Sequence, residues 1–99
     1  MRLFLYVDRM YFVYILYSSK TDKYYTGSTD NLDDRLNHHN SGSTPSTKSG
    51  APEWILKYIE TLPDRTTALK RELQIKKKKS RIYIEWIIAQ YQVGSASES

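Results

Sequence analysis

Residues 11–17, YFVYILY, constrain the fold more than any other part of the chain. Every residue in this run is aromatic, β-branched or leucine, which is typical of a β-strand. Because no polar residue interrupts the run, we predict a central strand that is covered on both faces. A chain of 99 residues can bury one modest core of this kind, so we expect a single domain.

A second short strand, residues 23–27, follows a polar turn and predicts a hairpin. Gly27 ends that strand, and a helix over residues 31–40 follows, which Ser41-Gly42 ends. Three side chains offer oxygens to cap its first turn: Ser28, Thr29 and Asp30.

The remaining elements are a strand over residues 54–60 and helices over 65–78 and 81–91. Asp64 or Thr66 would cap the first of these helices and Ser80 the second. Residues 43–52 are rich in Ser, Thr, Gly and Pro, which predicts a flexible loop that could move over a bound substrate. The order of elements predicts the α+β class, a small antiparallel sheet flanked by helices.

The two ends of the chain fall outside this pattern. We expect residues 1–10 to be an N-terminal extension, with Met10 as an alternative start, residues 11–91 to be the domain, and residues 92–99 to be a disordered tail. No apolar run approaches the roughly 18 residues of a transmembrane helix. The sequence therefore predicts no membrane partner.

The net charge is +4, which favours polyanionic partners, with nucleic acid first. The chain has no cysteine, which excludes disulfides and thiolate metal sites and fits a reducing, cytoplasmic location. The basic residues are concentrated in the second half. A nucleic-acid contact surface is predicted from Lys48, Lys70, Arg71, Lys76, Lys77, Lys78, Lys79 and Arg81, although such a run can also be a solvated face.

Two helices carry polar residues on faces that should be apolar. Arg35 and His39 share an arc with Leu32 and Leu36, whereas His38 lies off it. On the next helix, Glu72 lies within the apolar arc of Ala68, Leu69, Leu73 and Ile75. A glutamate there needs a cation, which could be Arg35, Lys76 or a divalent metal such as Mg²⁺.

Phe12-Val13-Tyr14, Tyr25-Thr26-Gly27, Arg35, His39 and Glu72 occur in this order with spacings that resemble the GIY-YIG nuclease family, most closely its small stand-alone members. The resemblance implies a three-stranded antiparallel sheet flanked by helices. It also implies that Tyr14, Tyr25, Arg35 and His39 are catalytic and that Glu72 holds a single Mg²⁺ or Mn²⁺ ion. The base could be Tyr14, Tyr25 or His39.

The sequence departs from the family pattern in several ways. The first tripeptide lacks the Gly and Ile of the family name, and the second has Thr26 in place of Ile. Ser28 stands where some members have a lysine, and no asparagine follows Asn40, although many members use a late one near the metal. The family resemblance implies a metal-dependent DNA endonuclease, expected to select branched, flapped or single-stranded DNA in repair or recombination. The alternatives are a catalytically weak nucleic-acid-binding module and a domain that contacts an acidic protein. We expect a monomer or weak dimer, with specificity supplied by substrate structure or a protein partner.

Overall fold

The computed structural model describes residues 10–98, so residues 1–9 of the expected extension lie outside it. Three antiparallel strands form one sheet in the order β2-β1-β3. Their bounds are Tyr11–Ser18 for β1, Lys23–Thr29 for β2 and Trp54–Leu62 for β3. The uninterrupted apolar strand is central, as predicted.

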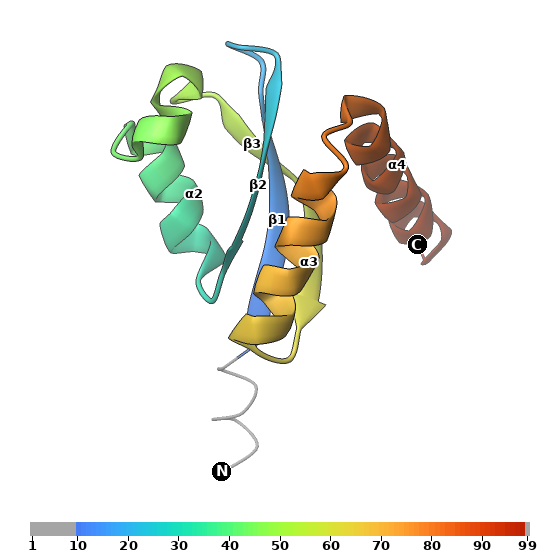
Figure 1. The fold of residues 1–99 in the computed structure, drawn as a ribbon. Helices are drawn as coiled ribbons and strands as arrows, with labels where there is room; N and C mark the ends of the chain where they lie inside the picture. Colours follow the sequence, from blue (N-terminus) through green and yellow to red (C-terminus); the bar gives the residue numbers. More distant parts are fainter. Residues whose placement is uncertain (1–9, 99) are drawn as a thin grey trace.

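Helices cover both faces of the sheet (Figure 1). Helix α2, Leu32–Ser41, lies on one face, and helices α3, Arg65–Lys77, and α4, Arg81–Glu98, lie on the other. The predicted α+β architecture, a three-stranded antiparallel sheet flanked by helices, is confirmed. Within residues 10–98, the helices are too short or too polar to span a bilayer.

The alternation of side chains along β1 divides the core into two clusters. Val13 and Ile15 pack beneath α3 and α4, against Ala68, Ile75, Ile87 and Ile88. Tyr14 and Leu16 face the other way and pack with Trp54, Tyr25, Leu32 and Leu36 beneath α2. Side chains from the two layers can therefore meet only at an edge of the sheet, and β2 is one of these edges.

Helix α2 starts at Leu32, one residue later than the start at Asn31 that the sequence predicts. Asn31 is the N-cap and accepts a hydrogen bond from the Asp34 amide at 3.1 Å. Thr29 instead accepts from the Asn31 amide and shapes the turn before the helix. The predicted caps were therefore wrong, because this turn places Asn31 at the helix entrance and leaves the side chains of Ser28 and Asp30 available for other contacts. The cap of α3 is Asp64, as predicted.

The segment predicted to be a flexible loop is ordered by tertiary contacts. Residues Pro45–Gly50 form a short 3₁₀ helix, η1. The Trp54 indole donates to the Thr47 carbonyl at 2.9 Å, and the Ser18 hydroxyl donates to the Gly50 carbonyl at 2.8 Å. These bonds fix η1 against the sheet, so the prediction of a mobile cover was wrong.

Two further expectations differ from the structure. Leu69 and Leu73 are exposed, because α3 buries only the narrow stripe of Ala68 and Ile75 against the sheet. Helix α4 continues to Glu98, beyond the end at residue 91 that the sequence predicts for this helix.

Candidate active site

Tyr14 and His39 form the buried part of the site. The Tyr14 hydroxyl lies 3.0 Å from His39 Nε2, and His39 Nδ1 lies 2.8 Å from Thr47 Oγ1. The Thr47 hydroxyl donates to the Thr44 carbonyl at 3.4 Å, so it accepts from His39 Nδ1–H. His39 Nε2 is then the acceptor for the Tyr14 proton, an assignment that follows from the hydrogen-bond network.

The electrostatics favour neutral forms of both residues. Burial raises the pKa of Tyr14 well above its usual value, with Tyr25 and Glu72 acting in the same direction and Arg35 opposing. Burial lowers the pKa of His39, and the positive charge of Arg35 lowers it further. A neutral His39 beside a protonated Tyr14 favours a shared proton over a free phenolate.

Tyr25 packs on the same imidazole from β2. Its ring centroid lies 4.8 Å from that of His39 and 6.3 Å from that of Tyr14. The Lys76 ammonium lies 5.8 Å from the centre of the Tyr25 ring. Tyr25 therefore lies between the buried pair and the charged residues of α3.

Glu72 reaches β2 from the other layer. Ser28 donates to Glu72 Oε1 at 2.6 Å, and Lys76 donates to Oε2. Of the two basic side chains weighed for this carboxylate from the sequence, Lys76 pairs with it and Arg35 does not. Only 13% of the Glu72 side chain is exposed, so the ion pair is partly shielded from water.

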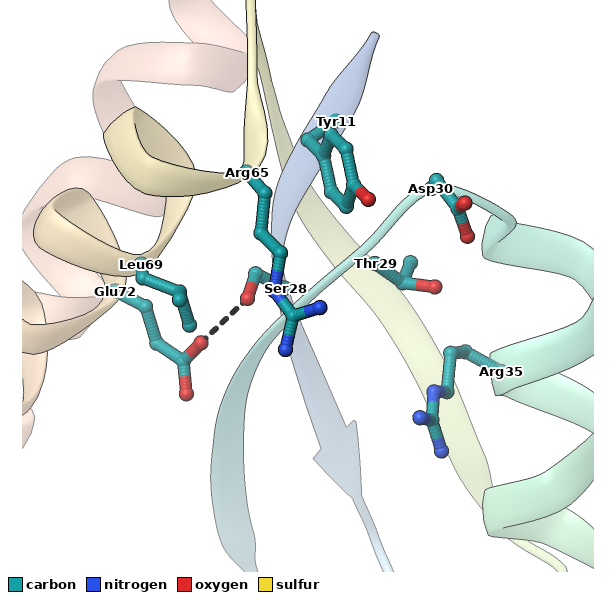
Figure 2. A pocket seen from close by; sticks show the side chains of 8 residues that line it. All are labelled: Tyr11, Ser28, Thr29, Asp30, Arg35, Arg65, Leu69 and Glu72. Carbon is teal, nitrogen blue, oxygen red and sulfur yellow. Dashed lines mark hydrogen bonds between the residues drawn. The ribbon is translucent and has the colours of Figure 1, made fainter. Parts of the chain in front are cut away.

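A pocket of about 420 Å³ opens where the two layers meet at the end of β2 (Figure 2). Arg35 points into it from α2, while Arg65 and Glu72 come from α3. The full lining is Tyr11, Ser28, Thr29, Asp30, Arg35, Arg65, Leu69 and Glu72.

The structure brings the five predicted site residues into one continuous cluster, although they do not all line the pocket. Arg35 and Glu72 do, and both influence the pKa of Tyr14 behind them. His39 is joined to Tyr14 by a hydrogen bond and to Tyr25 by ring contact. The pocket thus holds two of the predicted charged residues, Arg35 and Glu72, in front of a buried hydroxyl–imidazole pair.

Sequence reasoning missed Arg65, Asp30 and Thr47. Arg65 lies two helical turns before Glu72, and this spacing puts both on one face of α3. That periodicity was a usable signal for Arg65. Asp30 and Thr47 had none, because one follows a turn and the other lies in a short segment fixed by distant partners.

The predicted basic surface is divided by the fold. Lys76 and Lys79 line a cavity beside Tyr25, whereas Lys77 and Lys78 line another with Arg71 and Tyr83. Three of the predicted contacts already pair with carboxylates: Lys76 with Glu72, Arg71 with Glu60, and Arg81 with Asp22 and Glu85. Lys48 on η1 and Lys70 on α3 are exposed.

Comparison with known proteins identifies the family to which this site belongs. The family model described as the GIY-YIG catalytic domain matches residues 10–85. The chain belongs to the GIY-YIG nuclease family. The predicted family resemblance is therefore confirmed.

Relatives of this GIY-YIG protein carry the designation UPF0213. The chain is 38% identical to UPF0213 protein CPE1444 of Clostridium perfringens over 69% of its own length and 72% of the relative's. It is 45% identical to a UPF0213 protein of Syntrophus aciditrophicus over 67% and 76% of the two lengths. A solution structure of UPF0213 protein BH0048 from Bacillus halodurans superimposes with a TM-score of 0.52 at 27% identity, covering 82% of this chain and 84% of that one.

GIY-YIG nucleases typically depend on a divalent metal, and the donor set here limits how one could be held. The described residues contain no cluster of three or more His, Cys, Asp or Glu side chains. Glu72 is a single carboxylate facing a solvent-connected pocket beside the Ser28 hydroxyl. One carboxylate with waters and a substrate phosphate fits Mg²⁺ or Mn²⁺, provided that Lys76 gives up its bond to Oε2.

Proposed function

We propose that this protein is a metal-dependent DNA endonuclease of the GIY-YIG type that hydrolyses phosphodiester bonds, with preference for branched, flapped or single-stranded DNA. The expected setting is DNA repair or recombination in the cytoplasm. The observation that supports it most is the pocket at the end of β2, where Arg35 and Glu72 face one cavity beside the hydroxyl of Tyr14.

The residues of this chain account for two parts of the hydrolysis. Arg35 binds the oxygens of the scissile phosphate through its planar fork of donors and offsets the charge that builds on them. Tyr14 takes the proton of the attacking water as its own proton passes to His39 Nε2. Thr47 holds the opposite ring nitrogen, so His39 is oriented and neutral before the reaction begins.

Glu72 is the residue that would hold the divalent ion, and the ion would act as a Lewis acid on the leaving 3′ oxygen. Ser28 orients the carboxylate by donating to Oε1. Lys76 keeps the carboxylate paired when no ion is bound, because a lone partly buried charge is costly.

The surface that guides DNA extends from this pocket along β2. Lys76 and Lys79 lie beside Tyr25 on the same side as Glu72, so we propose them as backbone contacts. Lys48 and Lys70 remain proposed contacts at the periphery. Lys77 and Lys78 face the α4 side, and Arg71 and Arg81 are held in ion pairs away from the pocket, so we assign these four a smaller share of the DNA binding. Lys76 is paired with Glu72 and becomes free to contact DNA when an ion takes its place on that carboxylate.

The test is cleavage of a panel of branched, flapped and single-stranded DNAs with Mg²⁺ or Mn²⁺. Glu72→Gln keeps the size of the side chain and removes its charge, and we expect at least about a hundredfold loss of cleavage. Glu60→Gln is the matched control, because Glu60 is also a half-buried carboxylate paired with a basic residue, Arg71, yet does not line the pocket. Equal cleavage by wild type and Glu72→Gln would refute the metal assignment.

The ion pair at Glu72 is one specific reason to retain the alternative that the protein is a nucleic-acid-binding module with little or no catalysis. Lys76 already neutralises Glu72, which is the residue a metal would need. Salt-dependent DNA binding without a metal-dependent product on any member of the panel would favour this reading over catalysis.

A further inference from the structure

Arg65 is the first residue of α3, and its guanidinium projects into the same pocket as that of Arg35 (Figure 2). The two side chains enter from opposite layers, and the Ser28 hydroxyl and the Glu72 carboxylate line the same pocket. The pocket thus holds a second guanidinium for which the proposed hydrolysis has no use.

The arginines of the described residues fall into two groups. Arg71 and Arg81 each bind a carboxylate at 3.0 Å or less. Arg35 and Arg65 form no ion pair or side-chain hydrogen bond with any residue in 10–91. The two arginines whose donors are unused are therefore the two that line the pocket.

The charge of the pocket favours an anion. Glu72 is paired with Lys76, which leaves Asp30 as the pocket carboxylate that has no ion pair within residues 10–91, against two guanidinium groups. A volume of about 420 Å³ is within the range of ligand pockets and exceeds what one phosphodiester needs. Arginine's rigid fork is suited to phosphate oxygens, and each group can serve one phosphate.

The two arginines differ in their position relative to the chemistry. Arg35 is on α2, which covers the face of the sheet that carries Tyr14, whereas Arg65 is on α3 on the opposite face. Arg35 thus belongs to the same layer as the Tyr14 hydroxyl, and Arg65 does not. We propose that Arg65 binds the phosphate next to the scissile one, so that the pocket takes two consecutive phosphates of one nucleic-acid strand. This inference rests on the proposed function, which assigns the scissile phosphate to Arg35.

The test compares ligands with one and two phosphates in the absence of metal. Thymidine dinucleotide, TpT, has one phosphodiester and TpTpT has two, and each is titrated into the isotope-labelled protein and followed by NMR chemical shifts. Wild type should bind TpTpT about tenfold more tightly than TpT, since a hydrogen-bonded charge pair contributes about that much. A TpTpT analogue with one neutral methylphosphonate linkage should bind like TpT.

The decisive variant is Arg65→Gln, which should bind TpTpT and TpT with equal affinity. Lys57→Gln removes the same charge from β3, away from the pocket, and should retain the tenfold preference. A thermal melt of each variant checks that it folds. The proposal is overturned if wild type does not distinguish the ligands or if Arg65→Gln retains the preference. Neither affinity measurement requires cleavage, so the result is independent of whether the protein cleaves DNA.

Discussion

Gly27 lies directly against the hydroxyl of Tyr14, so closely that a Cβ atom at position 27 would come within 2.6 Å of Oη and 2.7 Å of Cζ. No side chain fits in that space without displacing the tyrosine ring. The absence of a side chain at Gly27 is therefore what allows the hydroxyl to reach His39 across the β1–β2 pair.

Gly27→Ala should therefore lower activity strongly. Moving a reacting group by about 1 Å can cost on the order of a hundredfold in rate, and overpacking costs about 1–3 kcal/mol of stability. Tyr14→Phe is the control, because it removes the hydroxyl without adding bulk and should lose similar activity. The measurements are cleavage rate and urea unfolding, and unchanged values for Gly27→Ala would contradict the geometry.

Thr47→Val should weaken the site without touching substrate. The change removes the acceptor of His39 Nδ1–H and leaves a buried donor unpaired, which costs about 1–3 kcal/mol in the free energy of unfolding. We also expect roughly a tenfold or greater loss in cleavage rate, since the imidazole is no longer held in one tautomer. Thr47→Ser restores the hydroxyl and should recover both quantities. If the valine and serine variants behave alike, Thr47 has no orienting role.

Protonation of His39 should make stability depend on pH below neutrality. Burial lowers the pKa of His39 in the folded state, whereas the unfolded chain titrates near the ordinary value of about 6.5. The unfolded state then binds more protons below that pH, so stability is present above about 6.5 and is lost as the pH falls towards the folded-state pKa.

Urea unfolding midpoints between pH 7.5 and 5 measure this loss. His39→Gln should flatten the curve, and His38→Gln should change it much less, because His38 is exposed and is the smallest of the contributions that lower the pKa of His39. The lowered pKa values of Asp22 and Asp64 place their titrations below this range. Parallel curves for wild type and His39→Gln would rule out this origin.

The fold places the lysines of residues 76–79 at two different cavities. Two double variants that remove the same charge should therefore differ in the salt dependence of their DNA binding. Lys76→Gln with Lys79→Gln removes charges beside Tyr25, and Lys77→Gln with Lys78→Gln removes two from the α4 side. The first pair should reduce the slope of log affinity against log salt by about 1.8 on duplex DNA, and the second by less than half as much. Fluorescence anisotropy from 50 to 300 mM salt gives both slopes. Equal slopes would mean that DNA affinity depends only on the net charge of the protein and not on where the lysines lie.

The sequence was most informative where a local pattern coincides with a tertiary role. The apolar run of β1 predicted the central strand, and the helical arc of α2 correctly favoured His39, which is buried, over His38, which is exposed. The cation for Glu72 was correctly among those named, since Lys76 follows it by one helical turn.

What the sequence could not predict depends on contacts between distant segments. Nothing local marks Pro45–Gly50 as ordered, because its partners are Trp54 and Ser18 from the sheet. Thr47 becomes a partner of His39 only once that segment is fixed. The exposure of Leu73 likewise follows from which side of α3 packs on the sheet, the side of Ala68 and Ile75, and the periodicity of the helix alone does not determine that side.

The division of the core into two clusters on opposite faces of the sheet has a consequence for folding intermediates. Tyr14, Tyr25 and His39 are organised by the α2 layer, whereas Glu72 and Arg65 come with the α3 layer. A partly unfolded chain that has released either layer keeps only half of the pocket. Under the proposed function, a nascent or damaged molecule would not cleave nucleic acid, since the pocket is complete only after both layers have docked.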